Sequence, residues 1–97
     1  MFATNFLPVL QKLAEDAWLV SGVPNALLPG LRESLLKNAV ANILRTGPVG
    51  ALTGPAARGD SAAIAKQSTA VANWDPLAGM AYDALSALAL RMANASK

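Results

Sequence analysis

Apolar residues recur along the chain at spacings of three and four, the repeat of α-helices with one face turned towards a protein interior. In residues 3–20 this apolar stripe avoids the charged positions Lys12, Glu15 and Asp16. No segment alternates strictly between apolar and polar residues, as half-buried strands do. Alanine and leucine, which favour helices, far outnumber the β-branched valine and isoleucine. The pattern therefore predicts an all-α protein.

Proline and glycine mark the ends of the first two predicted helices. Pro8 either lies in the first turn of a helix that starts near Leu7 or kinks a longer one. Ser21-Gly22 ends this helix, with Gly22 as the residue after its cap. Asn25 is the predicted N-cap of the second helix, and Pro29-Gly30 fits only near its start. That helix ends at residues 46–48, where glycine is followed by proline.

Residues 47–60 form a glycine- and proline-rich linker that contains few charges. A flexible linker is usually richer in serine and charge, so this segment is either functional or a short helix between two turns. Asp60 is the predicted cap of a third helix over residues 61–72, followed by a break at Asn73-Trp74. Asp75 then caps a fourth helix that has Pro76 in its first position. We therefore predict a single helical domain over residues 1–97, a small bundle of about four helices.

The composition indicates more apolar surface than a chain of this length can bury. Hydrophobic residues make up 54% of the 97 residues and charged residues only 14%, against about 25% charged in a soluble domain. A chain this short buries only about 60–65% of the surface of its unfolded form. The apolar excess is therefore expected to be covered by a partner domain or another copy.

Residue types that the chain lacks exclude several kinds of chemistry. The sequence contains no Cys and no His, which removes thiolate nucleophiles, disulfides and the commonest general base and metal ligand. The net charge is +2 and its eight basic residues are spread out, so we expect no nucleic-acid partner. Asp83 and Arg91 interrupt the longest apolar stretch, so we expect no membrane span. We predict no catalytic, metal-binding or cofactor-binding residue in this chain.

Few polar positions remain as candidates. Asn42 sits one turn before a helix end, where it either forms a hydrogen bond to the following loop, which we favour, or lines a pocket or interface. The tripeptide Arg58-Gly59-Asp60 is best explained by a turn at Gly59 and a helix cap at Asp60.

The segment at residues 51–60 carries the pattern A-L-T-G-P-x-x-R-G-D, preceded by N-I-L-R-T-G-P at 42–48 and T-N-F-L at 4–7. With these motifs the chain resembles the C-terminal helical domain of an uncharacterised family of Rossmann-like oxidoreductases. That family is similar to 6-phosphogluconate dehydrogenase, ketopantoate reductase and pyrroline-5-carboxylate reductase. The similarity extends over nearly the whole chain, but the histidine that the family usually carries shortly before the position of Asn5 is absent.

The resemblance implies both a context and a set of site residues. In such proteins an N-terminal Rossmann domain binds NADP, while the helical domain completes the substrate cleft and commonly dimerises. The resemblance implies that Asn5 and Asn42 face the cleft or hold the loop. It also implies that Thr53 and Arg58 act structurally or on an anionic substrate. Asp60 would cap its helix and pair with Arg58. The expected substrate-cleft or motif-loop residues are thus Asn5, Asn42, Thr53, Gly54, Arg58 and Asp60.

Two hypotheses follow from these observations. The first is a cytoplasmic dimerisation and substrate-cleft domain of an NADP-dependent oxidoreductase-like protein, which is not an enzyme by itself. The chain would then be either an excised domain or a stand-alone relative, working as a homodimer. The second is a self-contained helical homo-oligomer with no link to oxidoreductases.

Overall fold

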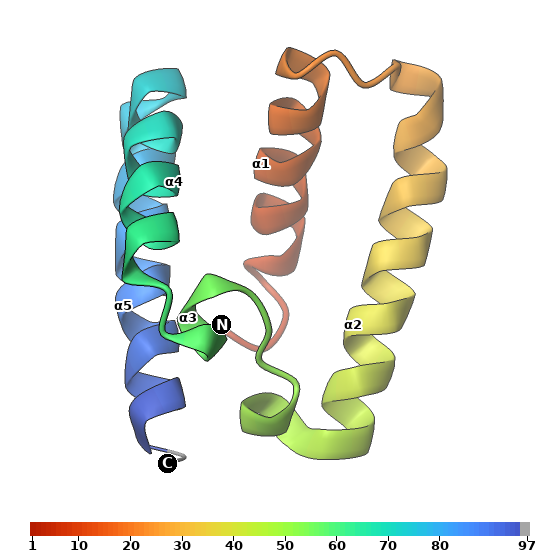
Figure 1. Ribbon diagram of the computed structural model, residues 1–97. Helices are drawn as coiled ribbons and strands as arrows, with labels where there is room; N and C mark the ends of the chain where they lie inside the picture. The colour runs from red at the N-terminus through yellow and green to blue at the C-terminus, as the bar shows by residue number, and fades with distance from the viewer. Residues whose placement is uncertain (96–97) are drawn as a thin grey trace. The chain divides into compact units, whose positions relative to one another are not determined.

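The structure, a computed structural model, describes residues 1–95 and is built from helices (Figure 1). No strand occurs in this part of the chain, so the predicted all-α class, with four long helices, is confirmed. The last two residues of the predicted domain, 96 and 97, lie outside the described residues. The elements in order are α1 (Leu7–Val20), the 3₁₀ helix η1 (Asn25–Leu27), α2 (Leu28–Gly50), α3 (Pro55–Arg58), α4 (Ser61–Trp74) and α5 (Pro76–Ala95).

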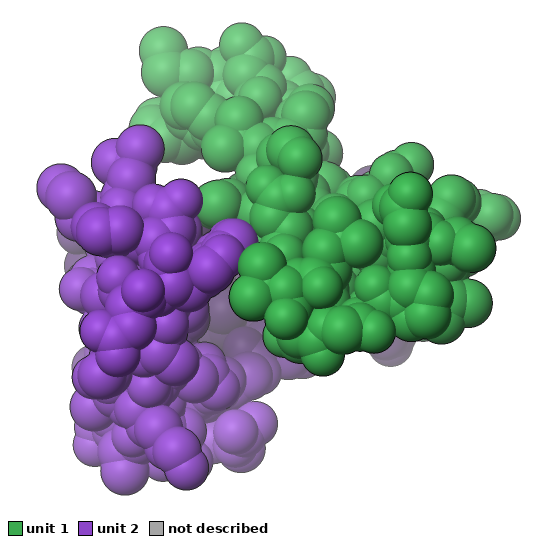
Figure 2. All heavy atoms as spheres, turned by 90° about the horizontal axis from the view of Figure 1, so that it is seen from above, with its two compact units in different colours: residues 1–41 green, residues 42–97 purple. Residues whose placement is uncertain are grey.

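The chain divides into two compact units, residues 1–41 and residues 42–97, which Figure 2 shows in different colours. Unit 1 holds α1, η1 and the first part of α2, and unit 2 holds the remainder. The boundary falls inside α2, where the sequence carries no glycine, proline or change of composition. The single domain over residues 1–97 stays a prediction.

The ends of α1 follow the local sequence signals. Pro8 lies in the first turn, so the first of its two predicted placements is correct. At the other end, Gly22 has a φ of 97°, and its N–H donates to the Leu19 carbonyl at 3.1 Å. The N–H of Val23 donates to the Trp18 carbonyl at 2.9 Å. These two bonds form a Schellman motif, which needs a left-handed residue and therefore favours glycine.

The start of the second helix differs from the prediction at Asn25. This residue opens the 3₁₀ helix, and no side-chain capping bond forms there. Instead, the Leu27 N–H donates to the carbonyl of Pro24, which stands in the cap position. The backbone of the 3₁₀ turn thus takes the role expected of the Asn25 side chain. Pro29 lies in the first turn of α2, as expected.

The second helix ends where glycine precedes proline. Gly47 has φ 78° and ψ 169°, so the regular helix stops at Thr46 and residues 48–50 form a separate turn. The linker then contains the short helix α3, with Gly54 (φ 88°) before it and Gly59 (φ 68°) after it. The linker therefore contains a short helix between two turns, which was one of its two interpretations.

Two aspartates begin the last two long helices, as predicted. The Asp60 carboxylate accepts from the Ala63 N–H at 3.0 Å, and the Asp75 carboxylate accepts from the N–H of Leu77 at 2.9 Å. The predicted break at Asn73-Trp74 is wrong, since α4 continues to Trp74. Only Asp75 leaves the helical conformation, with φ −153° and ψ 112°. The ring of Pro76 disfavours the α conformation in the residue before it, which explains why the break falls there.

Helices α4 and α5 pack closely because small residues lie between them. Ala78 and Gly79 of α5 are buried, and a Cβ atom built on Gly79 would lie 2.8 Å from the Ala72 Cα of α4. Ala56 of α3 and Ala93 of α5 are also buried. Apart from Leu28, every buried hydrophobic residue in the described part of the chain is therefore an alanine. The other large apolar side chains in this part of the chain are half-buried or exposed.

The Asp75 cap allows a direct test of how the last helix begins. We expect Asp75→Ala to lower the free energy of unfolding by about 1 kcal/mol, because the N–H groups of Leu77 and Ala78 lose their acceptor. Urea denaturation followed by circular dichroism measures this loss. Asp75→Asn keeps an acceptor oxygen and is expected to retain most of the stability. Equal losses in both variants would contradict the capping role.

Candidate functional site

The motif loop, defined here as residues 51–60, lies entirely within unit 2. Thr53 is exposed in the turn that follows α2. Gly54 precedes α3 with φ 88° and ψ −170°, a conformation that only glycine adopts easily. Arg58 is exposed at the end of α3. The structure thus brings Thr53, Gly54, Arg58 and Asp60 together around one four-residue helix.

The predicted ion pair between Arg58 and Asp60 does not form among residues 1–95. The Asp60 carboxylate instead accepts from the Ala63 N–H, while its own N–H donates to the Pro55 carbonyl at 2.9 Å. Both bonds hold Asp60 in the turn between α3 and α4. Its role in the structure is that of a cap, and the guanidinium of Arg58 stays exposed.

The two predicted asparagines make only local contacts. The side-chain oxygen Oδ1 of Asn5 accepts from the Thr4 hydroxyl at 3.2 Å in the exposed turn before α1. The Asn42 side chain accepts from the Arg45 guanidinium at 3.0 Å. The favoured interpretation, a hydrogen bond from Asn42 to the following loop, is therefore wrong, because a basic residue of the same helix lies within reach. Asn5 belongs to unit 1 and Asn42 to unit 2.

A pocket of about 220 Å³ lies beside the motif loop in unit 2. Among the predicted site residues, Thr53 lines it. The Tyr82 hydroxyl of α5 donates to the side-chain oxygen of Gln67 on α4 at 2.6 Å, and Ser86 adds a further hydroxyl to the wall. The polar lining is uncharged and suits a small neutral group. The full lining is Thr53, Pro55, Ala56, Ile64, Gln67, Tyr82, Leu85, Ser86 and Ala89.

Sequence reasoning missed the two hydrogen-bonded polar residues in the wall of this pocket. Gln67 and Tyr82 are 15 residues apart, and neither belongs to a recognisable motif. A usable signal was nevertheless present. The turn at Asp75 lies eight residues after Gln67 and seven before Tyr82, so an antiparallel pair of helices around it places the two side by side.

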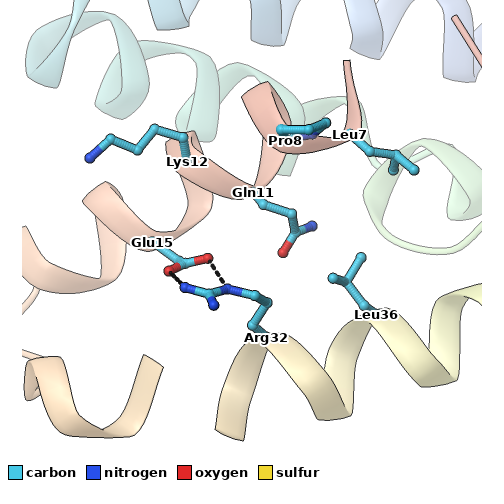
Figure 3. Close-up of a pocket in the computed structure, with 7 residues that line it drawn as sticks. All are labelled: Leu7, Pro8, Gln11, Lys12, Glu15, Arg32 and Leu36. Carbon is cyan, nitrogen blue, oxygen red and sulfur yellow. Dashed lines mark hydrogen bonds and ion pairs between the residues drawn. The ribbon is translucent and has the colours of Figure 1, made fainter. Parts of the chain in front are cut away.

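A larger pocket, of about 430 Å³, lies between α1 and α2 within unit 1. An ion pair with two hydrogen bonds lines it, from Arg32 Nη2 to Glu15 Oε1 at 2.6 Å and from Arg32 Nε to Glu15 Oε2 at 2.8 Å (Figure 3). No sequence pattern predicted this pair, because its members are 17 residues apart. The lining consists of Leu7, Pro8, Gln11, Lys12, Glu15, Arg32 and Leu36.

The ion pairs around this pocket reinforce the charges of their members. The hydrogen bonds from Arg32 lower the pKa of the Glu15 carboxyl, and the same bonds raise the pKa of the Arg32 guanidinium. A hydrogen bond to Asp16, at 2.7 Å, raises the pKa of Lys12. The Glu15 side chain is only 13% exposed. At neutral pH this wall of the pocket therefore carries a fixed carboxylate, a guanidinium and an ammonium group.

Two further findings concern the described residues alone. No group of three or more acidic, histidine or cysteine side chains there is arranged to hold a metal ion. No helix there is both long and apolar enough to cross a membrane.

Comparison with known protein families gives a match over most of the chain. No curated protein and no solved structure matches the chain. Residues 1–89 match the model of a family described as a domain of unknown function, DUF2520. This match includes α1, α2, α3, α4 and most of α5, with the motif loop and both pockets. The chain therefore belongs to the DUF2520 family.

Proposed function

We propose that this chain is the dimerisation and substrate-cleft domain of a cytoplasmic NADP-dependent oxidoreductase-like protein, and that it is not an enzyme by itself. The observation that carries the dimerisation part is an apolar face of α5 that its own unit leaves uncovered. The oxidoreductase part rests on the resemblance of the motif loop and its flanking segments.

Helix α5 has two apolar sides with different surroundings in unit 2. Ala78 and Gly79 are buried on the side that packs against α4. Leu77 and Met80 are 73% and 68% exposed, and Leu88 is 45% exposed. These three side chains form one stripe along the helix, because Met80 follows Leu77 by three residues and Leu88 follows Met80 by eight. Alanines lie between them on this side. We call Leu77, Met80 and Leu88 the outer face of α5.

The composition supports a second copy as the cover. Hydrophobic residues make up 54% of the sequence and charged residues only 14%, and a chain this short buries only about 60–65% of the surface of its unfolded form. Identical copies with exposed apolar helices associate most simply around a two-fold axis, through the same face.

The motif loop supplies the support for a substrate cleft. Its Thr53 borders the pocket that also holds Tyr82, Gln67 and Ser86, and Arg58 is exposed nearby in sequence. In the proteins that the chain resembles, a Rossmann domain binds NADP and closes the cleft from the other side. We therefore assign NADP to that domain in a full-length relative, and no catalytic residue to this chain.

Sedimentation equilibrium of the whole chain tests the proposed dimer. We expect a species of twice the 10.0 kDa chain mass at micromolar concentrations. A single well-folded monomer up to several hundred micromolar would contradict the proposal.

The cofactor assignment gives a separate prediction. The fold of residues 1–95 consists of helices joined by turns and contains no strand, so it lacks the strand, glycine loop and helix that bind a dinucleotide. We therefore expect no change in NADPH fluorescence when the isolated chain is added at up to about 1 mM, while a fused or co-expressed Rossmann partner restores binding. Tight binding of NADPH by the isolated chain would show the assignment to be wrong.

The stand-alone homo-oligomer remains the second candidate, because the outer face of α5 supports it equally well. The coding frame distinguishes the two. A Rossmann-coding segment directly upstream supports the oxidoreductase domain. An isolated start codon without such a neighbour supports the stand-alone protein.

A further inference from the structure

We infer that the pocket between α1 and α2 in unit 1 binds a small organic acid, with its carboxylate on Arg32 and its apolar body against Leu7, Pro8 and Leu36. This site is separate from the motif loop and does not depend on the proposed function.

The hydrogen-bond donors of the pocket are only partly used. The Nε and Nη2 atoms of Arg32 donate to Glu15. Arg32 Nη1 and the side-chain amide of Gln11 have no hydrogen-bond partner among residues 1–95. Figure 3 shows the Gln11 amide extending from α1 into the space between Arg32 and Leu36. A guanidinium has a second pair of N–H groups after one edge is taken, and this pair fits a second carboxylate.

Glu15 gives Arg32 a fixed position. Two hydrogen bonds to a side chain that is only 13% exposed restrict the guanidinium, which is itself 48% exposed. An arginine held in this way loses little further conformational freedom when it binds a ligand. The same carboxylate repels additional negative charge, which favours a monoanion over a phosphate or a dicarboxylate.

The charged side chains around the pocket balance one another. Arg32 pairs with Glu15, and Lys12 pairs with Asp16, which lies outside the lining. An incoming carboxylate would therefore bind through the unused N–H groups of Arg32 and Gln11 and not through a net positive charge.

The rest of the pocket is apolar. Leu7 and Pro8 come from the first turn of α1, and Leu36 faces them from α2 (Figure 3). The volume of about 430 Å³ lies within the roughly 300–1,000 Å³ of small-molecule sites. A polar wall of donors opposite an apolar surface suits an acid with an aromatic or branched aliphatic body.

Titration with benzoate, followed by ¹H–¹⁵N correlation spectra of the full chain, tests the inference. We expect shifts confined to the segments around residues 7–15 and 32–36, with millimolar affinity. Benzamide has the same shape without the charge, and we expect it to bind at least 10-fold more weakly. Benzylammonium is expected not to bind. Equal affinity for benzoate and benzamide, or shifts elsewhere only, would overturn the inference.

Two variants identify the groups responsible, and the spectra report folding in the same samples. Arg32→Lys keeps the charge but loses the second pair of N–H groups, and we expect benzoate affinity to fall at least fivefold. Gln11→Leu leaves the Glu15–Arg32 pair intact and is expected to weaken binding about threefold. Lys37→Gln is the control, because Lys37 lies on α2 in an exposed pair with Glu33. If Arg32→Lys disturbs the fold, Gln11→Leu decides, and unchanged affinity in that variant contradicts the site.

Discussion

The double variant Leu77→Glu with Met80→Glu is expected to be a monomer under conditions in which the parent chain is a dimer. Both side chains lie on the outer face of α5, 73% and 68% exposed in their own unit, so two carboxylates there leave its packing intact. In a two-fold interface the change would place four carboxylates at one contact. Burying unpaired charges costs several kcal/mol, so we expect the dissociation constant to rise by at least about 100-fold.

Sedimentation equilibrium measures this change, and circular dichroism shows that the variant stays helical. The matched control is Ala62→Glu with Ala65→Glu, two exposed positions with the same spacing on α4. We expect this control to keep the mass of the parent chain. Equal masses for the parent chain and the α5 variant would show that the outer face of α5 is not part of the interface.

Gly79→Ala is expected to destabilise the protein, although alanine is the better helix former. Replacing glycine by alanine inside a helix usually stabilises it by about 1 kcal/mol. At Gly79, however, the added Cβ would lie 2.8 Å from the Ala72 Cα and 3.1 Å from its backbone nitrogen. Backbone atoms cannot move away as the end of a side chain can, so α4 and α5 must separate. Overpacking of this kind costs about 1–3 kcal/mol beyond the gain.

Gly30→Ala provides the control for this prediction. Gly30 lies in the first turn of α2, and a Cβ built on it meets no atom within 4 Å. This variant is expected to be as stable as the parent chain or slightly more stable. Urea unfolding at one fixed protein concentration compares the three chains, since association also contributes to stability. A Gly79→Ala variant more stable than the parent would contradict the close packing of α4 and α5.

The helix boundaries that the sequence predicted correctly depend on neighbouring residues only. The turn at Gly22, the stop at Gly47-Pro48 and the caps at Asp60 and Asp75 each follow from the chemistry of a few adjacent groups. The errors at Asn25 and at Asn73-Trp74 also have causes in neighbouring residues. In one, a 3₁₀ turn replaced a side-chain cap, and in the other the effect of Pro76 on Asp75 fixed the break two residues later.

The candidate sites were harder to predict because they depend on how helices pair. The motif identified Thr53, which borders a pocket, but not Gln67 or Tyr82 on the facing helices. The Glu15–Arg32 pair joins residues 17 apart, and helix periodicity identified Glu15 only as a charged position outside the apolar stripe. The Arg58–Asp60 pair, which the resemblance implied, shows the opposite error, since the Asp60 carboxylate caps α4 instead.

The central claim is that two copies meet through the outer face of α5. A sample that mixes isotope-labelled and unlabelled chains tests it most directly, because filtered nuclear Overhauser spectra then report only contacts between copies. We predict intermolecular signals from the methyl groups of Leu77, Met80 and Leu88. If these methyl groups give no intermolecular signal, the copies do not meet through the outer face of α5 and the account is wrong.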